Sequence, residues 1–296
     1  MLGLVTLFAI ATALAAAIYV IGIAIEALRP PRATAAWAMA RGRPSCPADL
    51  GLESTEWILE PSRRRGLRLP VWEIELSKPT SPDDARTVIF IHGWGRSRID
   101  SLGRIGPFLD TASRMLFVDL AGHGDANGQT SLGDGDERDL AELVAKVPDG
   151  RVVLVGHSLG ATVAIRAAAM PEVAPRIERI IAIAPYDTVR SPIRGRLVAR
   201  ELPVRGVIPC VVAALRVAGI RPVSTLAAAR ELRVPLTVLH GDKDRVSPLS
   251  EGEAIAAAAK GEWVIFDDVE HAEHETRRPE LFVAAVRGKP RIEDQG

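Results

Sequence analysis

The chain has 296 residues, of which 47% are hydrophobic and 25% are charged, the composition of an ordinary globular protein. This length suits one large domain or two small ones. Lysine plus arginine and aspartate plus glutamate both number 37, so the formal net charge is zero and nothing in it indicates a nucleic-acid-binding protein.

The N-terminal stretch is apolar, and the first charged side chain in it is Glu26. As a helix rising about 1.5 Å per residue, residues 2–25 would be about 36 Å long, enough to cross a hydrocarbon core of about 30 Å. A signal peptide begins with a basic region and has a shorter apolar core, whereas the first arginine here is Arg29. We expect residues 1–28 to form a retained transmembrane anchor, with a cleaved signal peptide or a buried helix as the alternatives.

The basic residues nearest this stretch all follow it, and they are Arg29, Arg32, Arg41 and Arg43. The positive-inside rule therefore predicts a single-pass protein whose C-terminal domain lies on the cytoplasmic side of the membrane. Residues 30–47 are rich in proline, alanine and arginine and show no periodicity, so residues 29–50 are predicted to be a linker.

The remainder alternates between short β-branched runs and helical patterns. Two β-rich runs at 54–60 and 69–77 predict an antiparallel pair at a sheet edge. Further strands are expected at 87–91, 115–119, 152–155, 177–184, 236–240 and 263–267, and helices at 136–146 and 250–260. Apolar strands separated by helices predict an α/β fold with a mostly parallel central sheet flanked by helices, whose ligands bind beyond the carboxyl ends of the strands.

Residues 186–233 interrupt this alternation. An insertion of this length is too long for a simple connection between two strands, and it contains an apolar helical pattern at 207–220. We expect it to form a small helical cap over the site, within a domain that spans residues 51–290 and is followed by a tail at 291–296.

The most informative motif is GHSLG at 156–160, which stands between a β-branched run and an alanine-rich helical pattern. A strand that turns sharply into a helix leaves the turn residue strained and exposed, and the glycines avoid collisions with the crossing backbone. The serine hydroxyl is then presented at the positive N-terminal end of the helix. This nucleophile elbow predicts Ser158 as a nucleophile.

The motif HGWG at 92–95 follows an earlier strand and indicates a tight turn near the same edge. Such a turn can aim the backbone N–H of Trp94 into the cleft, where it and the N–H of Leu159 would form an oxyanion hole. The motif DLAGHG at 119–124 is interpreted as a rigid loop, which makes His123 a structural residue. His157 is next to the nucleophile, and because successive elbow residues diverge it should not serve as the base.

A carboxylate and a histidine are needed to activate the serine, and both occur late in the chain. HGDKDRVSP at 240–248 follows one expected strand, and DDVEHAEH at 267–274 follows the last one. The chain order of nucleophile, acid and histidine is that expected for this architecture. The spacing alone leaves Asp242 and Asp244, and His271 and His274, as alternatives.

From about residue 53 to residue 289 the chain resembles the α/β-hydrolase superfamily, and most of all its serine-hydrolase branch of esterases, lipases and S33-type peptidases. The resemblance rests on HGWG, DLAGHG, GHSLG, GDKDRVSP and HAE in the correct order. It implies that Asp244, four residues before Pro248, is the acid. It also implies that His271 is the histidine, because a Pro-Glu pair follows it at the family's spacing. Glu270 stands where the family commonly has glycine.

The implied reaction is acyl transfer. His271 deprotonates Ser158, Asp244 orients the imidazole, and water releases the acyl group. The resemblance implies no metal or organic cofactor, and Cys46 and Cys210 lack metal-ligand spacing. We expect a membrane-anchored carboxylesterase or lipase-like enzyme whose substrate is a small-molecule or lipid-like acyl ester. The alternatives are a peptidase or amidase of the same fold and a non-catalytic binding module.

Overall fold

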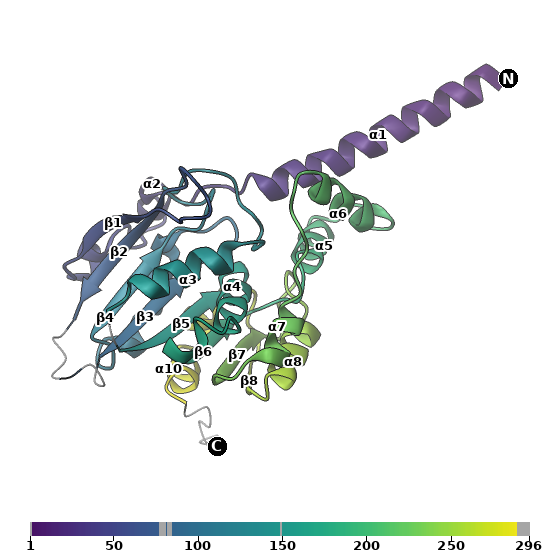
Figure 1. Ribbon diagram of the computed structural model, residues 1–296. Helices are drawn as coiled ribbons and strands as arrows, with labels where there is room; N and C mark the ends of the chain where they lie inside the picture. Colours follow the sequence, from purple (N-terminus) through teal and green to yellow (C-terminus); the bar gives the residue numbers. More distant parts are fainter. Residues whose placement is uncertain (1, 77–80, 82–84, 149, 289–296) are drawn as a thin grey trace.

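The computed structural model describes residues 2–76, 81, 85–148 and 150–288 of the chain. The predicted tail at 291–296 and the end of the predicted strand at 69–77 lie outside these ranges. In the described part, a central sheet has the strand order β1-β2-β4-β3-β5-β6-β7-β8 (Figure 1). Its strands are β1 (Thr55–Leu59), β2 (Leu69–Glu75), β3 (Arg86–Ile91), β4 (Arg114–Val118), β5 (Arg151–His157), β6 (Ile177–Ile183), β7 (Leu236–Gly241) and β8 (Glu262–Phe266).

The sheet has the predicted mixture of strand directions. Strand β2 runs antiparallel to both β1 and β4, whereas every pair from β4 to β8 is parallel. Strand β5 extends beyond the expected 152–155, because Gly156 and His157 still pair with Ala182 and Ile183 of β6. The nucleophile motif therefore begins inside the sheet and leaves it at Ser158.

Helices cover both faces of this sheet (Figure 1). They are α1 (Leu2–Leu28), α2 (Ala35–Met39), α3 (Asp136–Lys146), α4 (Leu159–Ala168), α5 (Arg190–Ala199), α6 (Val207–Val217), α7 (Thr225–Glu231), α8 (Leu249–Ala258), α9 (His274–Arg277) and α10 (Pro279–Val286). Strand β5 shows why the strand signals are continuously apolar: Val152 and Leu154 belong to the core that contains α4, whereas Val153 and Val155 belong to the core that contains α10. Burial on both faces is typical of a parallel sheet.

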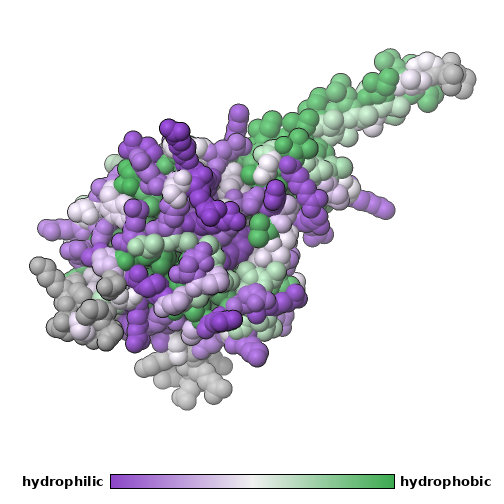
Figure 2. All heavy atoms as spheres, viewed as in Figure 1, coloured by the Kyte–Doolittle hydropathy of each residue, from purple (hydrophilic) through white to green (hydrophobic). Residues whose placement is uncertain are grey.

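Helix α1 projects away from the rest of the molecule and is apolar over its visible surface (Figures 1 and 2). Its span Gly3–Leu28 is long and apolar enough to cross a membrane, a test that a signal sequence near an N-terminus also passes. Only the C-terminal end of the helix is buried, where Ala27 and Leu28 pack in one cluster with Ile193 of α5 and Val211 of α6. The N-terminal part of α1 thus exposes an apolar surface, and the helix packs against the rest of the protein near its C-terminal end (Figure 2).

The 186–233 segment contains α5, α6 and α7. Helix α6 is shorter than the expected 207–220 pattern because the chain leaves the helix after Val217, and Gly219 adopts a left-handed φ of 87° just beyond it. Helix α7 packs into the main core through Ala229, so only α5 and α6 lie beside α1. Residues 186–233 thus connect α1 with the carboxyl ends of the strands, where Ser158 lies.

Candidate active site

Ser158 occupies a sharp turn between β5 and α4. Its backbone has φ of 52° and ψ of −111°, a conformation that a side chain rarely adopts. A Cβ atom at Gly156 would lie 2.4 Å from the Gly160 carbonyl oxygen, and one at Gly160 would lie 2.1 Å from the Ile91 carbonyl oxygen. The two glycines are therefore required for the turn to pack against the sheet, as the motif predicts.

Three side chains from separate loops form one hydrogen-bonded chain at the carboxyl edge of the sheet. His271 Nε2 lies 2.9 Å from Ser158 Oγ, and His271 Nδ1 lies 2.7 Å from Asp244 Oδ2. An ionised carboxylate only accepts, so Nδ1 carries the proton and Nε2 is left to accept from the serine hydroxyl. The structure thus brings together the serine, acid and histidine that were selected from the sequence.

Asp244 is held as an anion. Its Oδ1 accepts hydrogen bonds from the backbone N–H groups of Val246 and Ser247, at 2.7 and 2.8 Å. Burial raises the pKa of this carboxyl, but hydrogen bonds from His240 and His271 outweigh burial and hold the pKa well below its usual range. The carboxylate can therefore orient His271 and stabilise its cation.

Sequence reasoning missed His240. This side chain is fully buried, its Nε2 lies 3.1 Å from the Ser247 carbonyl oxygen, and the same nitrogen lies 3.4 Å from Asp244 Oδ2. His240 therefore fixes the loop that carries Asp244. The available signal was a histidine at the end of an otherwise apolar strand, where an imidazole needs a polar partner.

The turn that contains Trp94 packs directly on the elbow. A Cβ atom at Gly93 would lie 2.9 Å from His157 Nδ1 and 3.3 Å from Ser158 Cβ, so only glycine permits this approach. Leu159 is the first residue of α4, and N–H groups in the first turn of a helix have no partner within the helix. The predicted oxyanion residues thus flank Ser158 from two sides.

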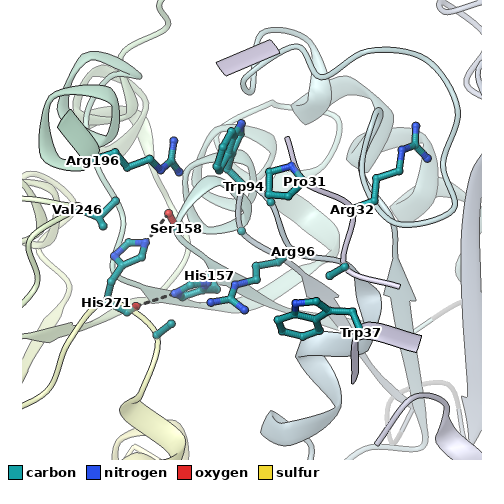
Figure 3. A pocket seen from close by; sticks show the side chains of 14 residues that line it. Pro31, Arg32, Trp37, Trp94, Arg96, His157, Ser158, Arg196, Val246 and His271 are labelled. Carbon is teal, nitrogen blue, oxygen red and sulfur yellow. Dashed lines mark hydrogen bonds between the residues drawn. The ribbon is translucent and has the colours of Figure 1, made fainter. Parts of the chain in front are cut away.

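Ser158 and His271 open into a cavity of about 370 Å³ (Figure 3). Its other walls come from parts of the chain that are distant in sequence. The linker after α1 contributes Pro31, Arg32, Ala33 and Trp37, and α5 contributes Arg196. Neither the linker nor Arg196 was expected at the site, because packing between distant segments leaves no local pattern in the sequence.

Residues 88–285 match the model of a family described as the alpha/beta hydrolase family. The chain belongs to the α/β hydrolase family. Among curated proteins, a sequence search finds no match.

Solved structures share the hydrolase fold. An esterase from Pyrococcus furiosus superposes with a TM-score of 0.68 at 22% identity, covering 88% of this chain and 96% of the esterase. An esterase from Thermogutta terrifontis gives 0.58 at 20% identity, covering 79% and 97%. A bacterial membrane phospholipase A gives 0.60 at 19% identity, covering 97% and 96%. At such identities the likeness establishes the fold.

Within this α/β hydrolase, His157 points away from the nucleophile's proton. Its Nε2 lies 2.8 Å from the carbonyl oxygen of His271, to which it donates. Burial is the main cause that lowers the pKa of His157 well below its ordinary value, so the ring is neutral. The side chain supports the segment that carries His271 and is not placed to act as a base, as the elbow geometry predicts.

The polar residues of the 119–124 loop are committed to the hydrolase scaffold. Asp119 accepts hydrogen bonds from the backbone N–H groups of Arg98 and Asp125, at 2.7 and 3.0 Å. Burial raises the pKa of Asp119 to about 6, against the lowering effect of Arg98. His123 is fully buried and its Nδ1 lies 3.0 Å from the Ala121 carbonyl oxygen. Neither side chain belongs to the series of hydrogen bonds that links Asp244, His271 and Ser158.

The structure also distinguishes Asp244 and His271 from Asp242 and His274, the alternatives that spacing alone left open. Asp242 accepts a hydrogen bond of 2.7 Å from the Asp268 N–H and ties two loops together. His274 is fully buried against Phe266, and neither of its ring nitrogens has a hydrogen-bond partner in the described part of the chain. In that part, no group of three or more histidine, cysteine, aspartate or glutamate side chains could hold a metal ion.

Proposed function

We propose that this α/β hydrolase is a membrane-anchored serine hydrolase that cleaves carboxylic esters through an acyl-enzyme on Ser158. The observation that carries the proposal is the continuous hydrogen-bonded chain from Ser158 through His271 to Asp244. A serine hydroxyl is a weak nucleophile until a base removes its proton, and this chain supplies both the base and the carboxylate that orients it.

The order of proton transfers follows from which atoms of Ser158, His271 and Asp244 can donate a proton and which can accept one. His271 Nε2 takes the hydroxyl proton as Ser158 Oγ attacks the ester carbonyl, and Asp244 stabilises the resulting imidazolium. The same proton then goes to the leaving alcohol. A water deprotonated by His271 attacks the acyl-serine and regenerates the free enzyme.

The backbone N–H groups of Trp94 and Leu159 are proposed to bind the oxyanion that forms in each half of the reaction. The positive end of α4 adds to this stabilisation because Leu159 is its first residue. Removal of one donor from an oxyanion hole costs about 10²–10³ in kcat. Backbone donors suit the role because they are rigid and do not titrate.

The membrane assignment rests on α1. The exposed apolar part of this helix has no partner in the described protein, and a bilayer would cover it (Figure 2). The basic residues on its C-terminal flank support a cytoplasmic location for the hydrolase domain. The Pyrococcus and Thermogutta neighbours are esterases and a third neighbour is a membrane phospholipase A, which supports an ester, including a lipid-like ester, as the substrate.

A substrate panel tests the reaction class. The full chain in detergent should hydrolyse p-nitrophenyl esters faster than aminoacyl p-nitroanilides, and Ser158→Ala should abolish both activities. Faster turnover of the anilides would assign a peptidase or amidase. A preference for long over short acyl chains would support the lipid-like substrate.

Fractionation tests the anchor. The protein expressed from its complete sequence should stay in the membrane pellet after extraction with alkaline carbonate, and intact mass should show residues 1–28 still attached. A soluble product that lacks these residues would assign a signal peptide instead.

A further inference from the structure

The part of the site lined by the linker and α5 is cationic, whereas an adjoining hollow that shares Arg96 and His271 is lined by four acidic residues, Asp100, Glu270, Glu273 and Glu275. Among the lining residues of the cavity at Ser158 in the described part of the chain are three arginines, Arg32, Arg96 and Arg196, and no aspartate or glutamate. Positive charge gathered in a cleft raises the local concentration of anionic ligands. The side of the cavity formed by the linker and α5 therefore favours an anion.

Two of these arginines are already committed to the protein. Arg32 donates from Nη1 to the carbonyl oxygens of Gly124 and Ala126, at 2.9 and 3.0 Å. Arg96 Nη1 lies 3.3 Å from Asp100 Oδ1, an ion pair on the same turn of chain. These contacts hold both guanidinium groups to the scaffold.

Arg196 differs from the other two. Its guanidinium carbon lies 3.8 Å from the centre of the Trp94 ring, a cation–π contact that fixes the plane of the group. Within the described residues, no side chain or carbonyl accepts a hydrogen bond from it. The negative charge of Glu26 raises the pKa of Arg196, but the Glu26 carboxylate forms its ion pair with Arg200, 2.6 Å away. The five N–H donors of Arg196 are thus oriented and unused.

The environment of Arg196 leaves its charge available to a ligand in the cavity. Burial lowers the pKa of Arg196 to about 10, so the group stays charged at neutral pH while it lacks a protein anion as a partner. A partly desolvated charge is costly unless it is paired. Figure 3 shows Arg196 reaching from α5 towards Trp94, next to Ser158. A ligand in the cavity can contact Arg196 and Ser158 together.

We propose that Arg196 is a specificity-determining residue that binds a phosphate group on the ester substrate. The planar guanidinium matches two oxygens of a phosphate in a bidentate contact. Aromatic and apolar side chains, Trp37, Trp94 and Pro31, form much of the remaining wall and suit the acyl part. The substrate class is a phosphate-bearing acyl ester, of the type of an acylglycerol phosphate. This inference rests on the proposed ester hydrolysis at Ser158.

The test compares two substrates that differ only in the phosphate, 1-octanoylglycerol 3-phosphate and 1-octanoylglycerol. The full chain in a non-ionic detergent should have a kcat/KM about ten- to a hundredfold higher for the phosphate ester, the effect of one hydrogen-bonded charge pair. Arg196→Gln should collapse this ratio towards one, mainly through KM, and Arg196→Lys should retain part of it. Using the ratio cancels any loss of activity that both substrates share.

The matched control is Arg194→Gln, which removes an exposed arginine on the same helix that does not line the cavity. The control should keep the wild-type ratio. Equal kcat/KM values for both substrates in the wild type, or an unchanged ratio in Arg196→Gln, would overturn the proposal while leaving ester hydrolysis intact. An Arg196→Gln variant that loses both activities equally would assign Arg196 to support of Trp94 alone, which also overturns it.

A binding measurement distinguishes failure of the phosphate subsite at Arg196 from failure of the proposed ester hydrolysis at Ser158. The Ser158→Ala variant should bind 1-O-octylglycerol 3-phosphate, an ether that cannot be hydrolysed, and Ser158→Ala with Arg196→Gln should bind it about ten- to a hundredfold more weakly. If the wild-type protein hydrolyses neither ester, binding to Ser158→Ala that depends on Arg196 would support the phosphate subsite and contradict the proposed function. Binding that does not depend on Arg196 would contradict the subsite.

Discussion

The indole N–H of Trp94 donates a hydrogen bond of 2.9 Å to the carbonyl oxygen of Ala27, in the last turn of α1. Carbonyl groups at a helix C-terminus have no partner within the helix, so this bond satisfies one of them. Trp94 also follows Gly93, which packs against Ser158. One side chain therefore joins the apolar helix to the loop beside the nucleophile.

Trp94→Phe should weaken this connection and leave the backbone N–H of residue 94 in place. We expect the free energy of unfolding to fall by about 1–3 kcal/mol, because a buried carbonyl loses its donor. Activity towards a soluble p-nitrophenyl ester should remain within about tenfold of the wild type, since the proposed oxyanion donor is the main chain. Urea denaturation in detergent and steady-state kinetics measure both quantities. Unchanged stability would show that the indole contact does not fix the helix to the loop.

Asp244→Asn should lower kcat by about 10⁴ with little change in KM, because an amide cannot stabilise the imidazolium and favours the wrong tautomer of His271. His240→Ala should lower kcat by about tenfold, because its ring fixes the Asp244 loop.

Asp242→Asn is the matched control for these variants, being a neighbouring carboxylate that instead receives the Asp268 N–H. Its kcat should stay within a few-fold of the wild type. A large loss of kcat in Asp242→Asn, with Asp244→Asn nearly active, would assign the acid to Asp242.

Asp119→Asn should affect folding rather than chemistry. The carboxylate accepts from two backbone N–H groups with separate oxygens, so the amide leaves one buried N–H without an acceptor and costs about 1–3 kcal/mol, while Arg98 keeps its pairs with Glu56 and Asp125. Turnover per active site, counted with a fluorophosphonate label, should stay within about threefold of the wild type. A fully stable but inactive Asp119→Asn protein would place this residue in the reaction.

Acid should unfold the protein through histidines that are buried in their neutral form. Burial lowers the pKa of His92 to about 4 and of His123 and His274 to about 3, from 6.5, and it also lowers the pKa of His157 well below 6.5. The unfolded chain therefore binds more protons below pH 6.5, and each group costs up to about 1.4 kcal/mol of stability per pH unit as the pH falls.

Two buried carboxyl groups act in the opposite direction. Burial raises the pKa of Asp119 and Asp139 to about 6, so the folded chain binds protons more readily than the unfolded chain between pH 6 and 3.8. Four histidines against two carboxyls leave a net loss of about 3 kcal/mol per pH unit below pH 6. Urea titrations at pH 7.5 to 5 measure this slope. His274→Leu should reduce it by about 1.4 kcal/mol per pH unit, and an unchanged slope would contradict the assignment.

The sequence predicts most of the fold because each strand here carries its own signal. Continuous apolar runs such as 152–155 reflect burial on both faces, and GHSLG combines two steric requirements that only glycine meets. Choosing Asp244 and His271 needed the family resemblance, since chain spacing does not distinguish Asp244 from Asp242. Arg196 and Trp37 could not be placed at the site, because their position depends on how α5 and the linker pack against Trp94.

Labelling by a fluorophosphonate probe tests the central claim most directly, because the probe phosphonylates a serine only when a neighbouring base activates it. The folded full chain should be labelled once, with the adduct mapped by peptide mass to Ser158, and the label should be lost in Ser158→Ala and strongly reduced in His271→Ala. A folded wild-type protein that takes up no label, or one labelled at another serine, would contradict a nucleophilic Ser158.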